Sequence, residues 1–70
     1  MAIAKVIEIT AESQKSFEDA IQQGIAGAAE TLHNIRSAWV KGQQVVVRDN
    51  KIESYRVDLK ITFVVEASAP

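Results

Sequence analysis

The chain has 70 residues, eight basic and nine acidic side chains, a net charge of −1 and a hydrophobic share of 47%. Mixed charges with no basic excess exclude a nucleic-acid surface, and no apolar run approaches the roughly 20 residues of a membrane span. There is no cysteine to build a disulfide framework or a thiolate metal site. We expect one domain, residues 1–70. A domain this small buries only about 60% of its surface alone, so oligomerisation is the remaining common means of stabilising it.

The first ten residues predict a short strand. Ala4–Thr10 alternates, with Ile7 and Ile9 on one side and Val6 and Glu8 on the other. Charged residues inside this apolar stretch do not match the layout of a signal peptide, and we expect a cytoplasmic protein.

One amphipathic helix is expected after a polar connection at residues 11–15. Ser16 and Asp19 resemble a capping box at its start. The helix should run from Phe17 to about His33, with Asn34 capping its end. Its apolar stripe repeats every three or four residues, at Phe17, Ile21, Ile25, Ala28 and Leu32. Gly24 and Gly27 keep one flank thin, which favours close packing of a sheet or helix.

Two strands should follow. The first spans residues 36–47, with a bulge at Gly42, and the turn Arg48–Lys51 leads into a long strand that begins at Ile52. Alternation in this last strand is unbroken, with apolar residues at Tyr55, Val57, Leu59, Ile61, Phe63 and Val65. Its length of about 45 Å exceeds the roughly 25–30 Å expected for a globule of this size. A strand longer than its own domain indicates an assembly, while the tail 67–70 should be loose.

The order β-α-β-β predicts an α+β fold, a three-stranded antiparallel sheet that wraps one helix. The sequence offers no catalytic constellation. His33 is the only histidine, and the acidic residues are scattered without a metal-binding spacing. We therefore expect a protein that is not an enzyme, and no metal-binding residue can be named.

Trp39 has two interpretations. The indole could fill a core or subunit interface, as large aromatics commonly do, or it could offer a flat face to an aromatic ligand. Basic residues near it could attract an anionic ligand, but they could equally be solvated, or pair with Glu53 and Asp58. These basic residues are Arg36, Lys41, Arg48 and Arg56.

Four segments resemble the dodecins in order and spacing across nearly the whole chain. They are Lys5–Ile9, Ser16–Ala20, Thr31–Ile35 and Tyr55–Phe63. The resemblance implies a subunit whose sheet wraps its helix and a hollow homododecamer of cubic symmetry. In flavin-binding members, flavins lie in pairs between tryptophans of facing subunits and are stored without turnover.

The family's ligand-binding positions have changed in this chain. The stacking tryptophan falls on Ser37 and a glutamine of the site falls on Arg56, while Trp39 follows two residues later on the same strand face. Arginines that bacterial relatives use for ligand phosphates fall on Gln44 and Val64.

Two functions therefore remain open. The first is a flavin-storage protein for FMN, riboflavin or a breakdown product, with Trp39, Arg56, Ser37 and Gln44 at the site. The alternative is a dodecin-like shell without flavin, in a structural or ion-associated role such as calcium binding, as the resemblance to divergent members implies. Carboxylates brought together by symmetry would then supply the oxygen ligands that calcium needs.

Overall fold

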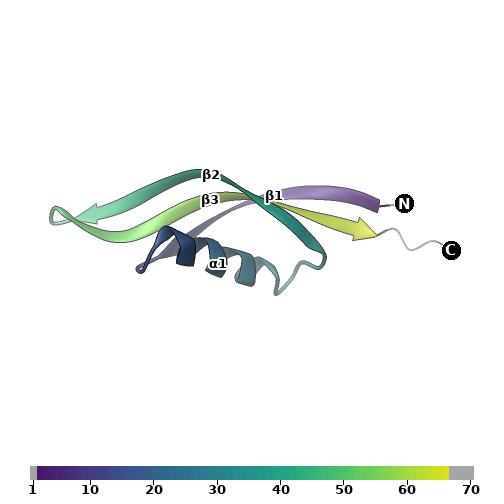
Figure 1. Cartoon of the computed structure of the whole chain (residues 1–70), viewed down its shortest axis with the longest axis horizontal. Coiled ribbons are helices and arrows are strands. Elements are labelled where there is room, and N and C mark those ends of the chain that lie inside the picture. Colours follow the sequence, from purple (N-terminus) through teal and green to yellow (C-terminus); the bar gives the residue numbers. More distant parts are fainter. Residues whose placement is uncertain (1, 67–70) are drawn as a thin grey trace.

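The computed structural model describes residues 2–66, which form four elements in the predicted order. These are strand β1 (Ala2–Ser13), helix α1 (Phe17–Ala28), strand β2 (Ile35–Arg48) and strand β3 (Lys51–Glu66). The sheet is antiparallel with the order β1-β3-β2, so β3 lies in the middle. Helix α1 covers one face of the sheet, and the β2–β3 hairpin extends past it (Figure 1). The α+β subunit is confirmed, whereas the tail 67–70 lies outside the described residues.

The core lies between β3 and α1. Val57, Leu59 and Ile61 of β3 are fully buried, and Ala20 of α1 is buried against them. Phe17 and Tyr55 close one end of this core with their rings edge to face, 5.1 Å between centroids. Apolar residues of β1, α1 and β2 surround the buried cluster, including Ile7, Ile9, Ile21, Ile25, Ile35 and Val40. The period-two pattern of β3 therefore supplies the centre of the fold, as predicted.

Helix α1 begins as predicted but ends early. Its first turn is capped by Ser16, whose Oγ accepts a hydrogen bond from the Asp19 N–H at 2.9 Å. The helix ends at Ala28, with Ala29 as its cap, so the predicted end near His33 is wrong. The N–H groups of residues 30 and 31 bond three residues back, which tightens and ends the last turn. The apolar periodicity continued to Leu32 because that residue, although beyond the helix, is half-buried and borders hollows that Ile9 and Phe63 of the sheet also line.

Asn34 does not cap the helix. It adopts a left-handed conformation (φ 62°) six residues beyond Ala28, directly before β2. Its carbonyl accepts a hydrogen bond from the Val64 N–H at 3.0 Å. This residue therefore turns the chain into the sheet, a use that its tolerance of the left-handed region permits.

The strands are longer than predicted. Residues 11–13 continue β1 because the long β3 offers them partners at residues 55–57. Arg48 pairs with Lys51, so the turn contains only Asp49 and Asn50. Both have positive φ, 53° and 62°, as a type I′ hairpin turn requires. The predicted bulge is present: the register shifts between Val40 and Gly42.

The subunit is elongated, as the long strand predicted. Its radius of gyration is 14.8 Å, against about 11 Å expected for a compact chain of this length. The hairpin that extends past α1 exposes Val47 and Ile52, with 59% and 56% of their surface accessible. Within residues 2–66, no helix is long and apolar enough to cross a membrane.

Candidate functional site

The four predicted site residues lie on the face of the sheet that α1 does not cover, which we call the helix-free face. The buried residues of β3 face the helix, and they alternate along the strand with a second set of side chains that must point away from it. This second set is Arg56, Asp58, Lys60 and Thr62. Directly paired residues of antiparallel strands share a face. Ser37 pairs with Thr62, Trp39 with Lys60 and Gln44 with Arg56, so all four candidates share this face.

A bulge in β2 puts Trp39 and Gln44 on the same side. Five positions separate these residues, and in a regular strand an odd separation places side chains on opposite faces. The register shift between Val40 and Gly42 leaves Lys41 as an extra residue and restores Gln44 to the helix-free face. Local irregularity in β2 therefore decides which side chains can act together.

Within one subunit the candidates form two separate pairs. Ser37 and Trp39 lie opposite residues 62 and 60 of β3, whereas Gln44 lies opposite Arg56. The partner of Trp39 on β3, Lys60, lies four positions from Arg56, which is about 13 Å along a strand. One chain alone therefore does not place all four residues around one ligand.

Trp39 is the most exposed large apolar residue of the described part, with 66% of its surface accessible. The ammonium groups of Lys41 and Lys60 each lie 5.9 Å from the centre of its ring. Cations at this distance interact favourably with the indole face. Sequence reasoning named Lys41 but missed Lys60, because only the register of β2 on β3 places Lys60 opposite the indole.

Arg56 is already engaged within the subunit. Its Nε and Nη2 both donate to Oε1 of Glu12, at 2.9 and 2.8 Å, across β1 and β3. Asp58, considered as a partner for the basic residues, instead accepts a hydrogen bond from the Thr10 hydroxyl at 3.0 Å. A ligand at Arg56 would therefore have to share this guanidinium with Glu12.

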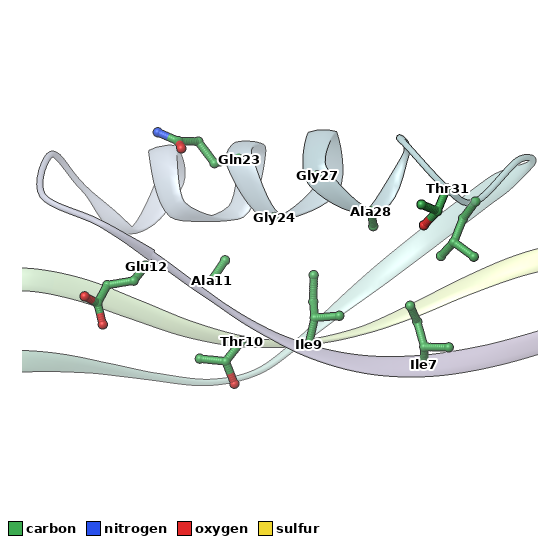
Figure 2. A pocket seen from close by; sticks show the side chains of 11 residues that line it. Ile7, Ile9, Thr10, Ala11, Glu12, Gln23, Gly24, Gly27, Ala28 and Thr31 are labelled. Atoms are coloured by element: carbon green, nitrogen blue, oxygen red, sulfur yellow. The ribbon is translucent and has the colours of Figure 1, made fainter.

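A groove of about 500 Å³ lies on the opposite side, between α1 and the outer strand β1. Figure 2 shows Ile7, Ile9 and Ala11 pointing from β1 toward Gly24 and Gly27 of the helix. No predicted site residue lines this groove. Gly27 contributes to the open space, because a Cβ there would meet nothing within 4 Å, whereas at Gly24 the helix closely approaches Ala11.

His33 does not join acidic side chains in a metal-binding cluster within the described part. His33 is exposed in the segment between α1 and β2, beside a shallow hollow of about 310 Å³. Within residues 2–66 no group of three or more histidine, aspartate and glutamate side chains is placed to hold a metal ion.

Comparison with known proteins finds chains of similar sequence and fold. The family model described as Dodecin matches residues 3–66. A protein named calcium dodecin, from Mycobacterium tuberculosis, is 30% identical over 70 residues, covering 100% of this chain and 99% of that protein. Its crystal structure, described as having a novel calcium-binding site, is matched with a TM-score of 0.81, 33% identity and 97% of each chain covered. A point mutant of the Thermus thermophilus dodecin gives a TM-score of 0.90 at 27% identity, with 96% and 100% covered.

Proposed function

Because this chain belongs to the dodecin family, we propose that it binds and stores flavin without chemical turnover, and that Trp39 supplies the stacking surface. The ligand would be FMN, riboflavin or a breakdown product of these. This proposal rests mainly on one observation, the exposure of 66% of an indole on the helix-free face. Burying that flat ring against another aromatic ring would remove apolar area from water and add a favourable stacking geometry.

At one end of the helix-free face, Ser37 and Trp39 fit such a ligand. The Ser37 hydroxyl offers no aromatic face but can exchange a hydrogen bond with a polar ring edge. Trp39, on the same face of β2, would take over the stacking. Gln44 and Arg56 belong to the second pair, and they would meet a ligand at Trp39 only through another subunit, since about 13 Å along the strand separates the two pairs.

Assembly is part of the proposal. A homododecamer would pair Trp39 of facing subunits around the ligand and cover the apolar residues of the protruding hairpin. The elongated shape and the exposed Val47 and Ile52 support association of some kind. Light scattering on the purified protein should give twelve times the chain mass of 7.7 kDa, and a monomer would contradict the proposal.

A fluorescence titration tests the flavin site. Riboflavin and FMN should each lose their fluorescence saturably when the apo protein is added, because a stacked indole quenches the excited flavin. Trp39→Ala should weaken binding by about tenfold or more, the loss expected for one aromatic stacking partner. Quenching that persists unchanged in Trp39→Ala would reject Trp39 as the stacking residue.

Two control variants separate stacking from general effects. Trp39→Phe keeps a smaller aromatic face and should retain part of the affinity. Ile3→Ala removes an exposed apolar side chain, 51% accessible, from the start of β1 and should leave binding unchanged. Each variant must first show the mass of the wild-type assembly by light scattering.

The alternative is a shell that binds calcium instead of flavin. The similarity to a protein named calcium dodecin favours it, as does a serine where the family's stacking tryptophan would stand. The ligands would be carboxylates of several subunits, because no metal-binding cluster exists within residues 2–66 of one chain. Isothermal titration with Ca²⁺, against Mg²⁺ as the control, distinguishes the two: saturable Ca²⁺ binding without flavin quenching would favour this alternative.

A further inference from the structure

Two lysines from different strands place their ammonium groups near the ring of Trp39. Lys60 is its direct cross-strand neighbour on β3, and Lys41 is the extra residue of the bulge on β2. Both ammonium groups stand 5.9 Å from the ring centre. The exposed aromatic surface and a local concentration of positive charge therefore coincide.

The positive charge at Trp39 is only partly balanced. Lys60 has a carboxylate partner, Glu8, with 3.7 Å between Nζ and Oε1. Elsewhere on the helix-free face, Arg56 forms an ion pair with Glu12. Among the described side chains, Lys41 forms no ion pair. The carboxylate of Asp58 lies on the same face beside the bulge, opposite Gly42, but it accepts a hydrogen bond from the Thr10 hydroxyl and forms no ion pair among the described side chains. The ammonium of the bulge residue Lys41 therefore lies beside the stacking ring without an ion-pair partner in the described part.

A neutral and an anionic ligand would use this arrangement differently. A neutral ring that stacks on the indole displaces an ammonium from the ring face and offers it no charge in return. An anionic group on the same ligand would accept the displaced ammonium as a charged hydrogen-bond donor. The long flexible lysine stem allows the ammonium to move from the ring to such a group.

We propose that the Trp39 site selects a planar aromatic ligand that carries a phosphate, with Lys41 as the main phosphate partner and Lys60 as the minor one. The ligand class is flavin mononucleotide rather than riboflavin, an inference that rests on the proposed flavin function. It assigns phosphate recognition to the bulge of β2. The positions of the family's phosphate-binding arginines, Gln44 and Val64, carry no positive charge here.

The experiment compares dissociation constants for FMN and riboflavin on the assembled protein by fluorescence quenching. FMN should bind about fivefold more tightly, the effect of one exposed ion pair. Lys41→Gln should bring the two constants close together, because FMN loses its phosphate partner while riboflavin no longer has to displace that ammonium from the ring. Lys60→Gln should narrow the difference less, because Glu8 already offsets that charge. Lys51→Gln, the same charge change at the hairpin turn, is the matched control and should preserve the preference.

Salt provides an independent check, since screening weakens exposed charge pairs. Raising the ionic strength should weaken FMN binding and leave riboflavin binding nearly constant. Equal constants for the two flavins in the wild type, or a preference unchanged in Lys41→Gln, would overturn the phosphate assignment while leaving the flavin function intact. Failure of both flavins to bind to the assembled wild type would overturn both proposals.

Discussion

The two faces of the same central strand have opposite environments. Leu59 faces the helix and is fully buried, whereas the next residue, Lys60, keeps 34% of its side chain accessible on the helix-free face. The helix-covered face holds an apolar core, and the helix-free face carries charged pairs and the exposed indole. One strand therefore stabilises the subunit with every second residue and leaves the others available for recognition.

The largest expected effect tests this division directly. Leu59→Ala should lower the free energy of unfolding by about 2–5 kcal/mol, because it leaves a cavity among fully buried neighbours. Lys60→Ala, one position along, should cost less than about 1 kcal/mol, as loss of an exposed ion pair does. Urea denaturation of both variants in parallel measures the difference. Similar losses for the two would show that the faces do not divide stability from recognition as we describe.

Two glycines sharpen the comparison on the helix side. A Cβ at Gly24 would lie 2.9 Å from Cβ of Ala11 and 3.1 Å from Cδ1 of Leu59, whereas at Gly27 it would meet nothing within 4 Å. Gly24→Ala should therefore destabilise the fold by about 1–3 kcal/mol through overpacking. Gly27→Ala should stabilise it by up to about 1 kcal/mol through helix propensity.

Thermal unfolding of the two glycine variants provides the measurement. Because both substitutions are glycine to alanine in one helix, their propensity gain is nearly equal, and the difference between them reports the close approach of α1 to β1. Equal shifts in melting temperature would contradict that close approach.

The smallest expected effect lies at the start of the helix, where β1 and α1 are joined by polar contacts. The Ser13 hydroxyl and the Gln23 amide both donate hydrogen bonds to the Asp19 carboxylate. These bonds, that from Ser13 more than that from Gln23, hold the pKa of Asp19 below its ordinary value of 3.8. A depressed pKa means that this stabilisation is present above about pH 4 and is lost as the pH falls through 3.8 toward the folded-state value.

A pH series checks that sign. Asp19→Asn should be less stable than the wild type near neutral pH. The difference should shrink below about pH 4, where the carboxylate of the unfolded chain binds a proton while the folded one, with its lowered pKa, still resists protonation. Ser13→Ala should also reduce the acid sensitivity, because it removes the stronger hydrogen bond. A stability difference that stays constant from pH 6 to pH 2 would contradict the role of the ionised Asp19.

Local patterns predicted the elements, and tertiary pairing set their limits. The alternation around Leu59 and the cap at Ser16 gave the correct strand and helix start because each depends on neighbouring residues alone. The ends of the strands and of the helix were harder to predict. β1 continued to Ser13 because β3 offered partners there, and α1 stopped at Ala28 although the apolar spacing continued. Pairing partners distant in sequence decide such limits, and no local pattern contains them.

The candidate site shows the same division. The residue types Trp39 and Lys41 are visible in the sequence as an aromatic beside a cation, separated by two positions along one strand. The register of β2 on β3 brought Lys60 to the same ring. The register of β1 on β3 placed Glu12 opposite Arg56, so Arg56 pairs with Glu12 and not with Asp58. An odd-numbered separation such as that of Trp39 and Gln44 becomes a shared face only through a bulge.

By itself, the sequence determined the order β-α-β-β, the buried alternation of β3 and the family to which the chain belongs, because each is encoded by residue type and spacing. Tertiary structure alone decided which charges meet on the helix-free face and that Lys60, beside Trp39, pairs with Glu8. The physical reason is that side-chain contacts across a sheet depend on strand register, and a single extra residue at Lys41 changes the face of the β2 positions that follow it, up to the next register shift after Val46.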